Sequence, residues 1–300
     1  MGNVVLIACT NVGRSMIEAI MNDECLQDVH LAGVVNLDPA TAVNKANYDP
    51  YTDLVEMYGL NLYYCKNVNE QGCIEFLKGC KPDIIIQSGW SQKFNQEILD
   101  IPSYACIGEH PAPLPKGRGA ACVNWAILTG EKEWGDTFFQ MEMQYDTGLV
   151  YAQEFFTIEQ YDDVKTVYDK VAYAAVTTIR KNLSNWINGN LEGTMQDDSK
   201  ATHYPRRRPS DGEFSFSGMP AGKLHDFIRA QARPYPGAYF VVNDKKVHVW
   251  KARLGDNPIP GEKLVYCQDH EPIILQRIQM EGEPEMWAED FSRLHSDIFL

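Results

Sequence analysis

Short apolar runs that alternate with amphipathic helical stretches constrain the fold of this chain most strongly. Val4–Ala8 and Ile84–Ile86 contain no polar residue, which is typical of strands buried on both faces of a parallel sheet. Similar strands are predicted at His30–Val35, Leu60–Tyr64 and Tyr104–Ile107, with helices between them. This alternation predicts an α/β domain, with a Rossmann-like parallel sheet covered by helices on both faces.

The chain changes character after a polar linker. Residues 1–188 form the predicted α/β domain, and 189–205 form a linker rich in Gly, Asn, Asp and Ser. Residues 206–300 hold a helix at Ala221–Gln231 and then alternating strands. This pattern predicts a smaller, β-rich domain that resembles an OB-like barrel.

Two turns carry the side chains that suggest catalysis. His110 is followed by prolines and a Lys-Gly-Arg-Gly turn, so it lies at the mouth of a stiff loop. Asp146 follows the strand predicted at Asp136–Met143, within the turn Tyr145–Gly148. Both groups are therefore expected at strand ends, where open α/β sheets bind ligands. A carboxylate beside an imidazole fixes its tautomer and raises its basicity, so the pair predicts a general-base site.

Ordered motifs give this chain a resemblance to a known family. The run His110–Gly148, from H-P-A-P-L-P-K-G-R-G to Q-Y-D-T-G, resembles the core signature of the formyltetrahydrofolate-dependent formyltransferases. The segments Arg206–Phe214 and Arg229–Phe240 resemble the second domain of methionyl-tRNA formyltransferase. These segments and the opening A-C-T-N-V-G-R-S-M-I-E-A-I look more like the branch that formylates 4-amino-arabinose for lipid A. The resemblance implies formyl transfer from N10-formyltetrahydrofolate to a primary amine, without a metal.

The resemblance also implies roles for individual residues. His110 would be the catalytic base, and Asp146 would orient it and stabilise the imidazolium. The folate would lie in a pocket whose assigned residues are Ser88, Gly89, Trp90, Met141 and Tyr145. From their loop positions, the residues assigned to the acceptor are Asn11, Arg14 and Lys116.

One position departs from the family pattern. The family has an asparagine two residues before the histidine, whereas this chain has Gly108. The asparagine amide helps to hold the formyl oxygen as it becomes an oxyanion, and the loss of one such donor costs about two to three orders of magnitude in rate. Either a backbone group or a nearby amide replaces it, or the protein is slow, altered in its acyl donor, or inactive. We favour an active enzyme with a rearranged donor.

The charge of the chain bears on the choice of acceptor. The net charge is −14, and residues 204–300 hold nearly equal numbers of basic and acidic residues. A domain that binds tRNA needs an excess of Lys and Arg to face phosphates. We therefore expect a nucleotide-linked amino sugar as the partner, and no nucleic acid. Methionyl-tRNA is the alternative acceptor, and a non-catalytic folate- or nucleotide-binding homologue is the alternative outcome of the Gly108 change.

The remaining composition predicts a cytoplasmic protein that does not contact a membrane. The eight cysteines include no C-x-x-C pair, so neither a zinc site nor a disulfide scaffold is expected. No apolar run approaches the roughly 18 residues of a membrane span, and the start of the chain lacks a leader pattern. The sequence is also compatible with a homodimer.

Overall fold

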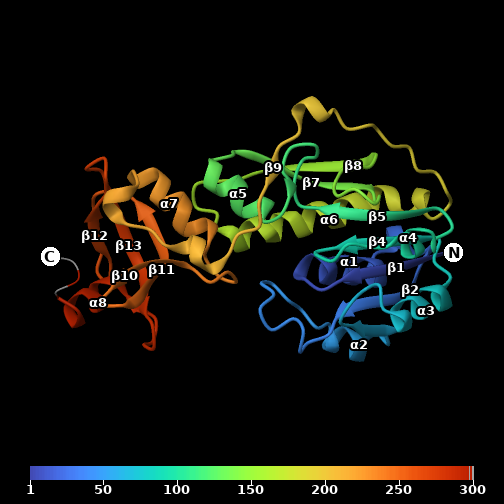
Figure 1. The fold of residues 1–300 in the computed structure, drawn as a ribbon, viewed down its shortest axis with the longest axis horizontal. Helices are drawn as coiled ribbons and strands as arrows, with labels where there is room; N and C mark the ends of the chain where they lie inside the picture. Colours follow the sequence, from blue (N-terminus) through green and yellow to red (C-terminus); the bar gives the residue numbers. More distant parts are fainter. Residues whose placement is uncertain (297, 299–300) are drawn as a thin grey trace. The chain divides into compact units, whose positions relative to one another are not determined.

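The computed structural model describes residues 1–296 and 298 (Figure 1). The chain forms two compact units that are interleaved in sequence. The first unit holds residues 1–122, 133–157 and 168–204, and the second holds 123–132, 158–167 and the chain from Pro205 onward. This division differs from the predicted one, because most of the expected linker packs with the first unit.

A seven-stranded sheet forms the centre of the first unit, in the order β3-β2-β1-β4-β5-β7-β8. The five strands from β3 to β5 are parallel, which confirms the predicted parallel sheet. β7 is antiparallel to β5, and β8 is antiparallel to β7. The short connection from β7 to β8 suffices for a hairpin but not for a parallel crossover. The strands are Gly2–Ala8 (β1), Val29–Leu37 (β2), Leu62–Cys65 (β3), Ile84–Ser88 (β4), Ala105–His110 (β5), Glu133–Gln140 (β7) and Val150–Thr157 (β8).

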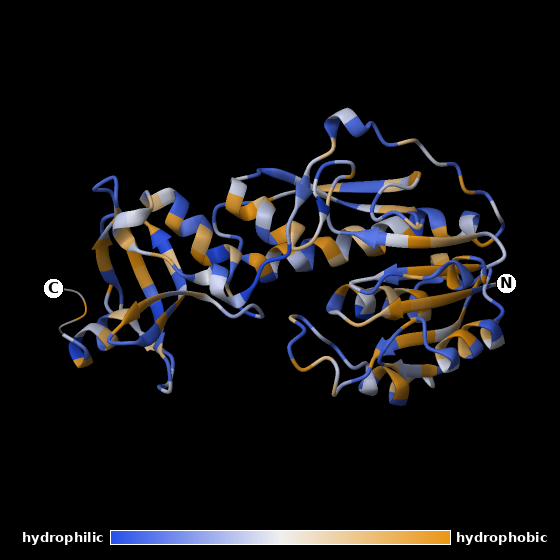
Figure 2. Ribbon diagram, in the orientation of Figure 1, coloured by the Kyte–Doolittle hydropathy of each residue, from blue (hydrophilic) through white to orange (hydrophobic). Residues whose placement is uncertain are grey.

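Helices pack on both faces of this sheet. α3 and α4 cover the face that carries Val5, Ile85 and Cys106, and α6 covers the opposite face, where the rings of Trp186 and Phe138 lie 5.7 Å apart. Figure 2 shows β1, in the middle of this sheet, as largely hydrophobic. The first six helices are Asn11–Asn22 (α1), Thr52–Tyr58 (α2), Gln71–Cys80 (α3), Gln96–Leu99 (α4), Cys122–Thr129 (α5) and Val164–Trp186 (α6). Among the described residues, no helix is long and apolar enough to cross a membrane.

The second unit contains an antiparallel sheet of five strands, which confirms the predicted β-rich domain. Its order is β10-β11-β13-β12, with β14 beside β13. Leu224, Ile228, Val247 and Phe291 contribute to its apolar core. Its elements are Ala221–Ala230 (α7), Ala238–Val242 (β10), Lys245–Leu254 (β11), Lys263–Tyr266 (β12), Pro272–Met280 (β13), Met286–Trp287 (β14) and Ala288–Leu294 (α8). The short strands Arg118–Gly119 (β6) and His203–Tyr204 (β9) pair in the first unit.

Candidate active site

His110 is the last residue of β5, and its side chain is buried beneath the turn that follows. Its Nε2 atom lies 2.8 Å from the backbone oxygen of Gly117. Because a carbonyl oxygen only accepts hydrogen bonds, Nε2 carries the hydrogen, and Nδ1 is the open nitrogen of the neutral ring. Gly117 therefore fixes the tautomer, a role that we had expected for Asp146.

Asp146 lies beside the open nitrogen of this imidazole. Its Oδ1 atom is 4.0 Å from Nδ1 of His110, and its Oδ2 atom accepts a 2.8 Å hydrogen bond from the backbone nitrogen of Gly119. The first distance exceeds that of a hydrogen bond, so the carboxylate acts on the imidazole through its charge. The structure thus brings together the two groups singled out in the sequence.

The route by which Asp146 reaches the site differs from the expected one. Because β7 runs antiparallel to β5, with Gln140 opposite Ile107, the end of β7 leads away from His110. The loop 141–149 therefore folds back to bring Asp146 to the imidazole. Asp146 itself has a left-handed backbone conformation, with φ of 58°. A loop, and not a strand end, positions the carboxylate.

Gln196 holds this loop although it is 50 residues away in sequence. Its Nε2 atom donates to the backbone oxygens of Asp146 and Gly148, each at 2.9 Å. Its Oε1 atom accepts from Arg118, which is also paired with Asp198 at 2.7 Å. Gln196 falls in the predicted linker, because a single glutamine in a polar stretch carries no signal of such a long-range contact.

Gly148 ends the Asp146 turn at a position without room for a side chain. An ideal Cβ there would lie 1.9 Å from the backbone oxygen of Gln140. We expect Gly148→Ala to lower the free energy of unfolding by about 1–3 kcal/mol through overpacking, and to reduce turnover because Asp146 is displaced. Urea unfolding and a turnover assay measure the two effects.

The control is Gly79→Ala in α3, where a Cβ meets no atom within 4 Å. This control should stabilise the fold by about 0.5–1 kcal/mol. If Gly148→Ala were as stable as wild type, position 148 would have room for a side chain and the prediction would be wrong.

Opposing effects set the pKa of His110. Burial is the largest and lowers the pKa, because an imidazolium loses its hydration. Interactions with Cys122, the Asp146 carboxylate and the Gly117 carbonyl act the other way and together raise the pKa to about 10. The site without ligand therefore holds an imidazolium beside a carboxylate at neutral pH. His110 must release that proton before it can act as a base.

Ser88, Gly89 and Trp90 lie at the end of β4. The Ser88 hydroxyl donates a 2.6 Å hydrogen bond to Oε2 of Glu109, so its backbone is the part left for a ligand. Gly89 has φ of +61°, and a Cβ there would lie 2.7 Å from the Thr10 side chain. The indole Nε1 of Trp90 is buried without a hydrogen-bond partner in the described residues. A buried donor of this kind suits a polar ligand.

Met141 and Tyr145 bring the Asp146 loop beside the turn after β4. The Met141 sulfur lies 3.6 Å from the sulfur of Cys106 on β5. The Tyr145 ring is 59% exposed, and Nζ of Lys93, from the segment that follows Trp90, lies 5.8 Å from its centre. The residues assigned to the folate thus come from two loops that meet. Aromatic rings, a thioether and one unpaired indole N–H are suited to a flat, nitrogen-rich ring system.

Arg14 is occupied by two carboxylates. Its guanidinium donates to Asp49 and Asp53, with distances of 2.8 Å and 2.7 Å from Nη2. These bonds raise the pKa of Arg14 above its ordinary value. An acceptor phosphate would have to break these ion pairs, so the expected acceptor contact from Arg14 has little support in this arrangement.

Asn11 and Lys116 are engaged by neighbouring residues. The Asn11 side chain accepts a hydrogen bond from the amide of Asn47. Nζ of Lys116 lies 5.5 Å from the centre of the Trp134 ring, within cation–π range. Lys116 belongs to the turn that covers His110, whereas Asn11 begins α1 after β1. These two expected acceptor residues thus lie on different elements, and each already interacts with a neighbouring side chain.

Gly108 is required by the packing around it. An ideal Cβ there would lie 2.7 Å and 2.8 Å from two ring atoms of Phe139, its cross-strand partner on β7. The Cγ atom of Met141 would be 3.2 Å away. Asparagine does not fit at this position unless the ring moves. The departure from the family pattern is therefore accompanied by a bulky side chain in the same space.

A pair of buried carboxyl groups lies on the other face of the sheet. Glu109 and Asp136 are 4% and 0% exposed, and they lie within hydrogen-bonding reach of each other. Both oxygens of Asp136 and Oε1 of Glu109 lack a hydrogen bond of good geometry in the described residues, although the backbone of Thr137 lies within reach of Asp136. Burial and the neighbouring Glu109 raise the pKa of Asp136 well above its ordinary value. The buried pair therefore favours the protonated form of Asp136, a feature that no pattern in the sequence indicates.

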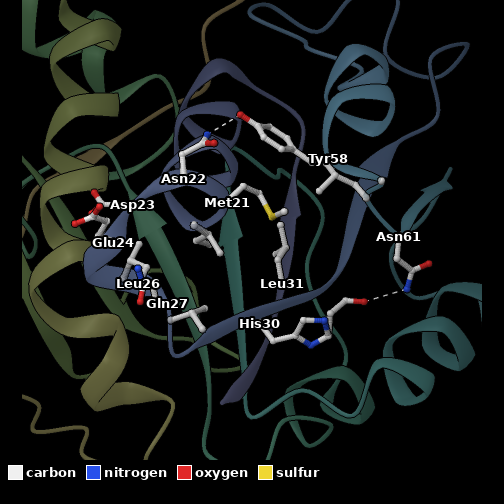
Figure 3. A pocket seen from close by; sticks show the side chains of 15 residues that line it. Met21, Asn22, Asp23, Glu24, Leu26, Gln27, His30, Leu31, Tyr58 and Asn61 are labelled. Atoms are coloured by element: carbon white, nitrogen blue, oxygen red, sulfur yellow. Dashed lines mark hydrogen bonds between the residues drawn. The ribbon is translucent and has the colours of Figure 1, made fainter.

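A cavity of about 510 Å³ lies at the amino end of the parallel strands, whereas His110 lies at the carboxyl end of β5. Figure 3 shows the side chains that line this cavity. It is lined by the end of α1, the start of β2 and the chain between α2 and β3. Asn22 donates a 2.6 Å hydrogen bond to the Tyr58 hydroxyl at its rim. Because it lies at the amino end of the parallel strands, we do not assign it to the reaction.

Comparison with known proteins agrees with this geometry. Residues 4–183 match the formyl transferase family, and residues 207–296 match the formyl transferase C-terminal domain. The chain is 32% identical to a methionyl-tRNA formyltransferase from Caldanaerobacter subterraneus over 259 residues, which cover 82% of each chain. It is 31% identical to the bifunctional polymyxin resistance protein ArnA of Wigglesworthia glossinidia brevipalpis, over 64% of this chain and 29% of that protein.

A solved structure has a similar fold over both domains. It is an N-formyltransferase from Helicobacter canadensis in complex with folinic acid and dTDP-3-aminofucose. The TM-score is 0.67 and the identity is 17%, and the match covers 92% of this chain and 99% of that one.

Proposed function

This chain belongs to the formyl transferase family and transfers a formyl group from N10-formyltetrahydrofolate, and we propose that it does so to the primary amine of a nucleotide-linked amino sugar. The observation that carries this choice is charge. The net charge is −14, and residues 204–300 have no basic excess. Counterion release from Lys and Arg dominates affinity for nucleic acids, so this composition favours a small acceptor.

The middle residue of the triple arginine at 206–208 is held within the second unit. The guanidinium of Arg207 donates to the backbone of Asp211 and to Gln231, at 2.7 Å and 3.0 Å. It also lies over the rings of Trp125 and Phe227, at 5.2 Å and 5.9 Å. Arg207 therefore stabilises the second unit, and its stacked position leaves it poorly placed to bind a phosphate backbone.

One similar protein of known structure supports the same acceptor. The likeness to an N-formyltransferase bound to dTDP-3-aminofucose supports an amino-sugar acceptor. Folates and nucleotide-linked sugars are charged, water-soluble molecules, so we place the activity in the cytoplasm. Formation of a homodimer is also compatible with this proposal.

We assign the proton transfers to His110 and Asp146. The acceptor nitrogen would attack the formyl carbon while Nδ1 of neutral His110 takes its proton. The Asp146 carboxylate, 4.0 Å from Nδ1, would stabilise the imidazolium that forms. As the bond between the formyl carbon and N10 breaks, this proton would pass to the folate nitrogen. The products are the N-formyl sugar and tetrahydrofolate.

A mass-spectrometric screen tests the proposal. The full chain is incubated with N10-formyltetrahydrofolate and a panel of UDP-, dTDP-, GDP- and CMP-linked amino sugars. We expect one sugar to gain a single formyl group, and the His110→Asn variant to give none. If no sugar reacts but the protein binds folate, the amino-sugar assignment fails.

Methionyl-tRNA is a second candidate acceptor, because the 32% identical relative is a methionyl-tRNA formyltransferase. Initiator methionyl-tRNA therefore belongs in the same screen. Formylation of the tRNA, with affinity that falls steeply as salt rises, would favour this alternative. Folate binding without turnover on any acceptor would favour a non-catalytic homologue.

A further inference from the structure

The site needs a hydrogen-bond donor that position 108 cannot supply. Negative charge develops on the formyl oxygen during acyl transfer, and enzymes place N–H groups where that charge appears. Gly108 has no side chain, and the Phe139 ring fills the space beside it. A replacement donor would have to lie on the same sheet face and at the same edge as His110.

Gln87 meets both conditions. It lies directly opposite Gly108 in the parallel pairing of β4 with β5. Opposed residues of neighbouring strands point to the same face, and His110 lies two residues beyond Gly108 on that face. The Gln87 side chain therefore lies beside position 108, where the asparagine side chain is missing. Gln87 is 9% exposed, so it lies at the boundary of the interior.

The Gln87 amide contacts the turn after β4 and is weakly held. Its Nε2 atom donates to the backbone oxygen of Trp90 at 3.3 Å, beyond the usual range for a strong hydrogen bond. Trp90 follows the end of β4, so the amide extends toward the edge where the site forms. The amide has a second N–H, for which the described residues show no hydrogen bond, and it can donate to a ligand.

Two other polar side chains near His110, those of Thr137 and Gln153, are already engaged. The Thr137 hydroxyl donates to the backbone oxygen of Ala112 at 2.6 Å. The Gln153 amide donates to Leu114 and to Thr137, at 2.7 Å and 2.9 Å. These groups stabilise the turn that covers His110, and they would have to break its contacts to reach a substrate.

We propose that the amide of Gln87 replaces the missing asparagine and donates a hydrogen bond to the formyl oxygen as it becomes an oxyanion. The inference rests on the formyl transfer proposed above. Neighbouring strands are about 4.8 Å apart, and glutamine is one methylene longer than asparagine. The longer side chain, starting one strand away, reaches toward the space that the shorter one would occupy from β5.

The test compares Gln87→Met with wild type, because methionine keeps the length of the side chain without the amide. We expect kcat to fall by about 10²–10³-fold. We expect the Michaelis constant for the acceptor and the affinity for 5-formyltetrahydrofolate, measured by calorimetry, to change by less than about threefold, because the lost bond forms mainly in the transition state. Gln71→Met, on the exposed side of α3, is the matched control and should leave kcat unchanged.

A rescue experiment tests the geometry. Phe139→Leu removes the ring that blocks position 108. The triple variant Gln87→Met/Gly108→Asn/Phe139→Leu regains an amide donor at position 108. Its kcat should therefore be at least about tenfold higher than that of Gln87→Met/Phe139→Leu, which is part of the rate lost when one donor is removed. If Gln87→Met does not fold, Gln87→Asn replaces it, and the shortened amide should lower kcat without weakening folate binding.

The outcomes separate this inference from the proposed function. An active wild type with Gln87→Met within about threefold of its kcat would overturn the role of Gln87. A large drop in folate affinity with unchanged kcat would also overturn it, because Gln87 would then bind the ground state. A wild type that formylates no amine would contradict the proposed function, whereas the inference about Gln87 is judged on an enzyme that turns over.

Discussion

The His110→Asn variant is expected to lose about 10²–10⁴-fold in kcat, the contribution of a positioned general base. The asparagine amide can still donate toward the backbone oxygen of Gly117, which lies 2.8 Å from the imidazole, so we expect the fold to persist. The proton-accepting Nδ1 atom is lost. His30→Asn is the control, because His30 is exposed and contacts Asn3. A normal kcat in His110→Asn would remove the role of base.

The pH profile of Asp146→Asn tests the second member of the pair. The wild-type rate should rise with pH toward the His110 pKa of about 10, because only the neutral imidazole accepts a proton. Removing the Asp146 charge lowers this pKa, so the variant should reach its plateau at lower pH. The plateau should also be lower, by up to about 10⁴-fold as in triads that lose their carboxylate. Values of kcat/KM between pH 6 and pH 10.5 measure both effects.

The raised pKa of His110 also makes the stability of the fold depend on pH. A histidine whose pKa is raised in the folded state stabilises the fold below the unfolded pKa of about 6.5. This contribution is lost as pH rises from there through the folded pKa of about 10. Asp146→Asn should therefore destabilise the protein more at pH 6 than at pH 10. An unshifted activity profile and a pH-independent loss of stability would contradict the coupling between the two residues.

The elements that could be predicted from the sequence are those with local signals. The apolar run Val4–Ala8 marks β1 within a residue or two of its ends, and the prolines after His110 mark the turn that covers it. A parallel sheet places its carboxyl ends at one edge, so the neighbourhood of Ser88 and His110 followed from the topology. Local pattern and global fold agree in these segments.

The rest depended on contacts between distant residues. The antiparallel β7 cannot be distinguished from a parallel strand by its apolar residues, and its direction decides how Asp146 arrives. Gln196 reaches the site from a polar stretch whose composition is that of a linker. Gln87 gains significance only from its register with Gly108. Register and long-range hydrogen bonds leave no periodic trace in the sequence.

Asp136→Asn is expected to stabilise the protein at pH 8 by about 1–3 kcal/mol, the desolvation penalty of a buried unpaired polar group. Both carboxyl oxygens of Asp136 are buried without a hydrogen bond of good geometry in the described residues, and Glu109 and the backbone of Thr137 lie within reach. An asparagine amide can donate to the Glu109 carboxylate, which already accepts from Ser88 at 2.6 Å. In the wild type, the carboxyl groups of Asp136 and Glu109 are both acceptors, so their contact needs a shared proton. Asp136→Asn replaces this contact by a hydrogen bond from the amide.

The pH dependence distinguishes this explanation from simple repacking. The raised pKa of Asp136 means that the folded state keeps a proton that the unfolded chain releases above its ordinary pKa of 3.8. Wild-type stability should therefore fall as pH rises above that value, until the folded pKa is passed. The advantage of Asp136→Asn should be large at pH 8 and shrink toward pH 4. Glu56→Gln, an exposed change in α2, controls for the loss of one charge. Urea unfolding across this range measures the difference, and a variant less stable than wild type at pH 8 would show that the buried carboxylate is favourable as it stands.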